Sequence, residues 1–84
     1  MKTNLAEIVV RDIEFFSLSS DSEINPDVAV KQLEIIASLL KQLPEQELNN
    51  FLLQATKRLE RLRGEGASQK HLNLLENIRN HLGI

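Results

Sequence analysis

Two apolar stripes separated by a proline lie in residues 26–63, PDVAVKQLEIIASLLKQLPEQELNNFLLQATKRLERLR. Each stripe advances in alternating steps of four and three residues, the spacing that keeps one side of a helix facing a partner. The stripes consist of Ala29, Leu33, Ile36, Leu40 and Leu43, and of Leu48, Leu52, Ala55, Leu59 and Leu62. The step from Leu43 to Leu48 breaks the register, and Pro44 lies within it. The pattern predicts two matched helices that meet at a proline.

Pro44 leaves two arrangements open. Proline disfavours helical backbone in the residue before it, and Glu45 and Glu47 suit the positive start of a new helix. These signals favour a tight antiparallel hairpin of helices over residues 26–42 and 44–63. The alternative is one long kinked helix, because proline is tolerated inside helices at a cost. A hairpin lets the chain fold alone, whereas a long helix would leave both stripes as a binding site for another chain.

Signals at helix ends organise the remaining sequence. Asn25 and Pro26 are typical of a helix start, and Gly64 is typical of a helix end. Two further apolar patterns predict helices over residues 5–16 and 68–82. They consist of Leu5, Ile8, Val9, Ile13 and Phe16, and of Leu72, Leu75, Ile78 and Leu82. We therefore predict one all-α domain over residues 1–84, a small four-helix up-down bundle with a central helical hairpin.

The composition limits the chemistry of the chain. Its 84 residues contain no cysteine, which excludes disulfides, thiolate metal ligands and a cysteine nucleophile. His71 and His81 lie ten residues apart and so fall on different faces of the predicted helix. Its three glycines suit helix ends and form no phosphate-binding loop. We predict a protein that is not an enzyme and has no cofactor and no metal site.

The beginning of the sequence bears on its location. Charged residues interrupt the apolar ones soon after Met1, which does not match a signal peptide. No run of about 20 apolar residues occurs that would span a membrane. We expect a cytoplasmic protein.

Charge is distributed unevenly along the chain. The net charge is −2, but residues 1–56 carry −5 and residues 57–84 carry +3. The basic residues in the second part form a candidate contact site for a partner or for nucleic acid: Lys57, Arg58, Arg61, Arg63 and Lys70. Cations are also favoured in the last turns of a helix, and the chain has no Tyr or Trp for stacking on bases. Nucleic-acid binding is therefore the second of two functional hypotheses.

Several apolar residues remain outside the main stripes. Helix 26–42 carries a second apolar flank, so it must be covered on more than one side. The candidate interface residues are Val10, Phe15, Ile35, Leu39, Leu53 and Leu74. Together they exceed the apolar surface that a chain of this length can hide, which makes a symmetric homodimer an alternative to a monomer.

The first functional hypothesis is protein–protein interaction. We expect a small helical protein that acts as an inhibitor, an adaptor or an immunity-type factor by presenting its helix faces to a partner. In size and layout the predicted bundle is similar to the small four-helix bacteriocin immunity proteins. This is a likeness of fold, and function has to be argued from the site itself.

Overall fold

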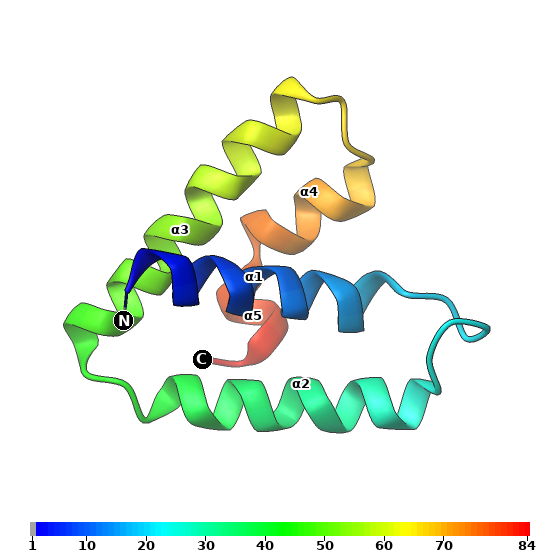
Figure 1. Cartoon of the computed structure of the whole chain (residues 1–84), viewed down its shortest axis with the longest axis horizontal. Helices are drawn as coiled ribbons and strands as arrows, with labels where there is room; N and C mark the ends of the chain where they lie inside the picture. Colours follow the sequence, from blue (N-terminus) through cyan, green and yellow to red (C-terminus); the bar gives the residue numbers. More distant parts are fainter. Residues whose placement is uncertain (1) are drawn as a thin grey trace.

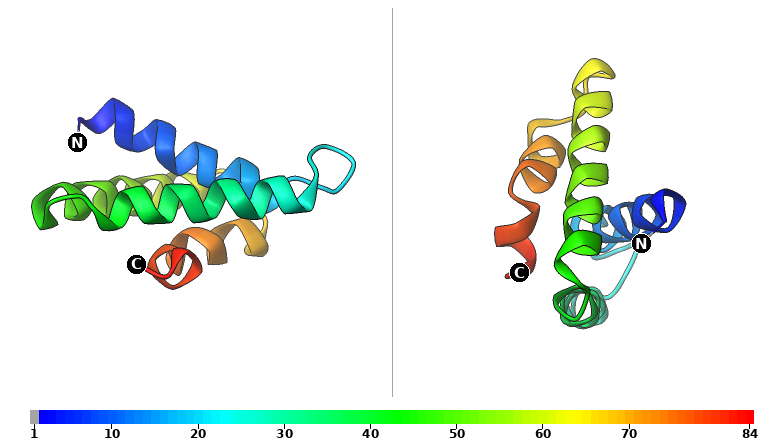
Figure 2. Two further views of the ribbon diagram at one scale, coloured as in Figure 1. Left: turned by 90° about the horizontal axis from the view of Figure 1, so that it is seen from below. Right: turned by 90° about the vertical axis from the view of Figure 1, so that its left-hand side faces the viewer.

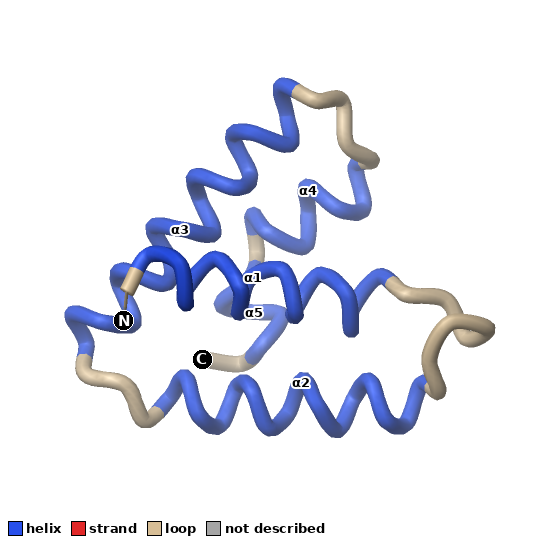
Figure 3. Tube along the Cα trace, in the orientation of Figure 1, coloured by secondary structure: helices blue, strands red, loops and turns tan. Residues whose placement is uncertain are grey.

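The computed structural model describes residues 2–84 and contains five helices (Figure 1). They are α1 (Thr3–Leu18), α2 (Pro26–Lys41), α3 (Glu45–Gly64), α4 (Gln69–Glu76) and α5 (Ile78–Leu82). Turns and loops connect them, and residues 2–84 contain no strand (Figure 3). The prediction of a small all-α bundle is confirmed.

Local signals set the helix boundaries. The side chain of Asn25 accepts a hydrogen bond from the backbone N–H of Asp27 at 2.8 Å and caps α2, whose first residue is Pro26. Pro44 lies just before α3 with extended backbone (φ −55°, ψ 149°). The chain therefore forms two separate helices at Pro44, and the single kinked helix does not occur.

The two helices that meet at Pro44 form an open V (Figure 1). In Figure 2, α1 lies on one side of this V and the α4–α5 segment lies on the other. α1 packs against both α2 and α3, and α3 also packs against α4, whereas α2 and α3 contact each other at few points. The expected hairpin is therefore splayed, and α1 is the helix that joins its two arms.

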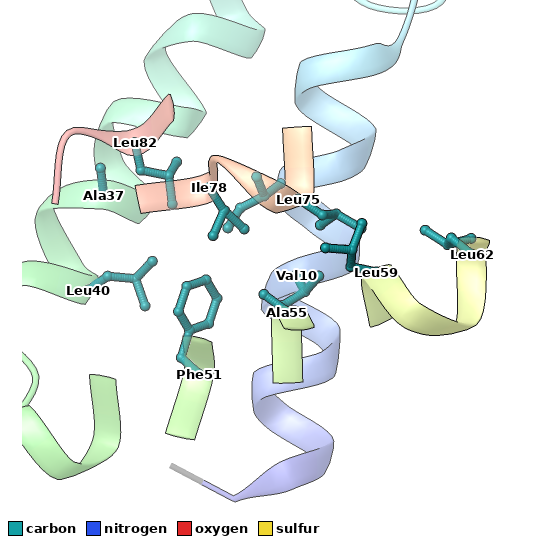
Figure 4. Close-up of a cluster of buried hydrophobic side chains, with 11 residues drawn as sticks. Val10, Ala37, Leu40, Phe51, Ala55, Leu59, Leu62, Leu75, Ile78 and Leu82 are labelled. Atoms are coloured by element: carbon teal, nitrogen blue, oxygen red, sulfur yellow. The ribbon is translucent and has the colours of Figure 1, made fainter. Parts of the chain in front are cut away.

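Phe51 of α3 and side chains of the α4–α5 segment fill the space between the arms. Phe51 of α3 is fully buried, and Figure 4 shows its ring between Leu40 of α2, Val10 of α1 and Ile78 of α5. An aromatic ring and a short helix occupy the region where two directly paired helices would touch. This packing explains why the arms diverge.

The helix predicted over residues 68–82 is divided at Asn77. This residue leaves helical geometry (φ −112°, ψ 27°), and its side-chain amide donates to the carbonyl of Asn73 at 3.1 Å. Such local side-chain hydrogen bonds compete with a continuous helix. The break redirects α5 toward α2, which buries Ile78 and Leu82 in the core.

α1 buries a different face from the expected one. Ala6, Val10 and Ile13 are fully buried, whereas Leu5 and Ile8 of the predicted apolar face are exposed. Ile13 is the one member of the predicted face that is fully buried. α1 thus buries Val10 and Ile13 together with the small Ala6, and it leaves Leu5, Ile8 and Phe15 exposed.

The molecule is flat. Its Cα atoms extend over 37 × 31 × 21 Å, with a radius of gyration of 12.5 Å. A compact chain of this length would have a radius of gyration of about 11.8 Å. Figure 1 looks down the shortest dimension with α1 in front. Within residues 2–84, no helix combines the length and the apolar character needed to cross a membrane.

Candidate functional site

A buried ion-pair network joins α1, α3 and α4. Glu14 of α1 is only 6% exposed. Arg58 of α3 donates from Nε to Glu14 Oε2 at 2.6 Å and from Nη2 to Oε1 at 2.9 Å. His71 of α4 shares Oε1 through Nε2 at 2.8 Å, and because a carboxylate can only accept, the histidine is the donor. Both carboxylate oxygens of Glu14 therefore accept hydrogen bonds from side chains of this protein.

The network keeps Glu14 charged. Burial alone would raise the pKa of this carboxyl group, but hydrogen bonds and positive charge from Arg58 and His71 outweigh burial and lower the pKa from its usual 4.5. The hydrogen bond to Glu14 raises the pKa of Arg58. A group that stays ionised and fully hydrogen-bonded is poorly suited to transfer protons near pH 7. The geometry thus points to a structural crosslink.

Glu14 should contribute to the acid sensitivity of the fold. Because its folded pKa is lowered, its contribution to the free energy of unfolding is complete above about pH 4.5 and is lost as the pH falls through the folded pKa. We expect Glu14→Gln to be less stable than wild type near pH 7, with a difference that shrinks below pH 4.5. Urea unfolding at about pH 7, 5, 4 and 3 measures this difference. A difference that stays constant with pH would contradict the lowered pKa.

The structure removes Arg58 from the expected basic contact site. Its side chain is 15% exposed, and its guanidinium group is held by Glu14. Lys57 and Lys70 are exposed and form no ion pair within residues 2–84. Arg58 was therefore wrongly placed in an open patch, because its partner lies 44 residues earlier in the sequence.

The other two arginines of the expected site point to different neighbours. Arg61 approaches Glu7 of α1 at 4.0 Å, and Arg63 approaches Glu76 of α4 at 3.8 Å. Both pairs are exposed, so each contributes little to stability. Positive charges of α3 are thus directed to acidic groups on two sides of the helix. Part of the positive charge that the sequence concentrates in residues 57–84 is therefore paired with acidic side chains of neighbouring helices.

The candidate interface residues divide into two groups. Val10 and Leu74 are 0% and 8% exposed, so they belong to the interior, and their assignment to an interface was wrong. Val10 is buried because α1 is rotated from the expected orientation, so that Ala6, Val10 and Ile13 face the core. The remaining four are exposed by 43 to 58%: Phe15, Ile35, Leu39 and Leu53.

Six of the seven large apolar side chains exposed on α1 and α2 form one strip on each helix, and we call these two strips the α1–α2 face. It consists of Leu5, Ile8 and Phe15 on α1, and of Val28, Ile35 and Leu39 on α2. The spacing within each helix places each set on one side of that helix. α1 and α2 are packed together, so the two strips belong to neighbouring helices. The strip on α2 contains the second apolar flank seen in the sequence, which the other four helices leave exposed.

The α1–α2 face is continuous with the interior. Val9 of α1 and Ile36 of α2 are partly buried and pack against the core. On α1, the exposed ring of Phe15 meets the half-buried ring of Phe16 edge to face, with centroids 5.3 Å apart. The apolar layer therefore extends from the core to the surface, in contrast to the isolated Leu53 on α3.

No family model, curated protein or solved structure matches this chain. The similarity in layout to bacteriocin immunity proteins accordingly has no support from the comparisons. Within residues 2–84, no cluster of three His, Asp or Glu side chains has the arrangement needed to hold a metal ion.

Proposed function

We propose that this protein is a non-enzymatic interaction module that binds another polypeptide through its α1–α2 face. The observation that carries the proposal is that α1 leaves large apolar side chains exposed although it buries a glutamate. Leu5, Ile8 and Phe15 are exposed, whereas Glu14 is buried together with Ala6, Val10 and Ile13. Large apolar side chains are normally the first to be buried and glutamate is among the last, so an exposed apolar cluster is typical of a binding surface.

The charged groups support the same function. Glu14, Arg58 and His71 bind one another, and Arg61 and Arg63 lie near acidic residues of neighbouring helices. Glu14, Arg58 and His71 join three helices, and the two exposed arginines also have acidic neighbours within the fold. The apolar side chains of the α1–α2 face, in contrast, remain exposed, so this face is a large surface available to a partner.

Substitution of Ile35 tests the proposal. Tagged protein is mixed with extract from its source cells, the bound polypeptide is identified, and the affinity of the purified pair is then measured by titration. We expect Ile35→Asp to weaken binding by about tenfold or more, because a buried charge without a partner is costly in an interface. Leu53→Asp is the matched control, since Leu53 is 50% exposed but lies on α3 outside the face. Equal affinities of wild type and Ile35→Asp would overturn the proposal.

A further inference from the structure

We infer that the polypeptide covering the α1–α2 face is a second copy of this chain, so that two flat molecules stack into a symmetric dimer. This inference rests on the proposed function and adds the identity of the partner. The dimensions of the face, the shape of the molecule and the balance of charge on the face favour a second copy.

The dimensions of the face suit a dimer. Each of its helices has 16 residues, which corresponds to a length of about 24 Å, and neighbouring helix axes lie about 8–10 Å apart. Two such faces would bury on the order of 1,200 Å² in total, the lower end of stable interfaces. Each copy would contribute roughly a tenth of its 5497 Å² surface, the usual share for a small protein.

The shape of the molecule favours stacking on this side. The shortest dimension is 21 Å, and α1 lies at the front along that direction (Figure 1). Figure 2 shows the α4–α5 segment on the other side of the V, where Leu74, Ile78 and Leu82 are buried. A second copy over α1 and α2 would thicken the molecule where it is thin and would bury the exposed strips.

The charges on the face complement a second copy. Asp12 lies within the α1 strip, four residues after Ile8, and Lys31 lies at the edge of the α2 strip, four residues before Ile35. Both are exposed, and neither forms an ion pair within residues 2–84. A two-fold axis parallel to the helices places α1 of one copy on α2 of the other. Asp12 of each copy then faces the side of the second copy that carries Lys31.

The test is the mass in solution, measured by light scattering at about 1 to 200 µM chain, because dimer formation follows mass action. We expect twice 9.6 kDa for wild type and for Leu53→Asp, and 9.6 kDa for Ile35→Asp with its helical circular dichroism retained. Ile35→Ser is the second variant if Ile35→Asp loses helicity. A wild type that stays at 9.6 kDa, or a folded Ile35→Asp that remains a dimer, overturns the inference.

Charge reversal tests the arrangement within the dimer. Asp12→Lys should weaken dimerisation several-fold, and the double variant Asp12→Lys with Lys31→Asp should restore it, because both symmetric pairs are re-formed. A double variant that is weaker than Asp12→Lys would overturn the placement of α1 on α2. A monomeric wild type would overturn the inference that the partner is a second copy. The proposed function is tested separately by the capture experiment with Ile35→Asp.

Discussion

Replacing Phe51 with alanine is expected to lower the free energy of unfolding by about 3–5 kcal/mol. Phe51 is the largest of the fully buried side chains and contacts the core between the arms of the V (Figure 4). The whole domain should be stable by only about 4–13 kcal/mol. The substitution would therefore remove a large part of the stability and populate unfolded chain at moderate temperature.

Urea unfolding followed by circular dichroism measures this loss. Leu53→Ala is the control, since it removes an apolar side chain from the same helix at a position that is 50% exposed. We expect the control to cost less than about 1 kcal/mol. If Phe51→Ala cost no more than Leu53→Ala, the ring would not be what holds the arms of the V around the core.

The helix boundaries were predictable because their causes are local. Asn25 and Pro26 start α2, and Pro44 separates α2 from α3, through effects that act within one helical turn. The stripes of α2 and α3 also predicted much of the core, including Leu40 and Leu59. For these elements, the residues that decide the structure are neighbours in the sequence.

The rotation of α1 was not predictable in the same way. Apolar residues occur on more than one side of this helix, and the side that is buried also carries Glu14. Glu14 is bound there by Arg58 and His71, which lie 44 and 57 residues further along the chain. A periodicity that counts only apolar residues places Glu14 outside the core. Glu14, one turn after Val10, was the sequence signal that marks the buried side of α1. It becomes informative only once its partners Arg58 and His71 are known.

The candidate site was predictable in part for the same reason. Ile35 and Leu39 form a second flank on α2 that is visible from their spacing alone, and both are exposed. Val10 is buried because α1 is rotated toward the side that carries Ile13 and Glu14, and Leu74 is buried by the packing of α4. The exposed strip on α1 follows from that same rotation, so sequence reasoning could not join it to the strip on α2.

Arg58→Met is expected to lower the free energy of unfolding by about 2–4 kcal/mol at neutral pH, because it leaves Glu14 buried with His71 as its remaining partner. Arg61→Met is the control, and its exposed pair with Glu7 should contribute no more than about 1 kcal/mol. Urea unfolding of both variants measures the difference. Equal losses would show that Glu14 remains solvated without Arg58.

The double variant Glu14→Leu with Arg58→Met tests whether the ion pair chiefly stabilises the fold or chiefly fixes the rotation of α1. Replacing both members of a buried ion pair with apolar side chains of similar size is often neutral, so we expect this variant to lie within about 1 kcal/mol of wild type. A double-mutant cycle would then give a large coupling free energy between Glu14 and Arg58, although replacing both residues together changes the free energy of unfolding little. Such a result would mean that the pair chiefly fixes the rotation of α1. Because that rotation keeps Leu5, Ile8 and Phe15 exposed, the ion pair would govern the α1–α2 face without being part of it.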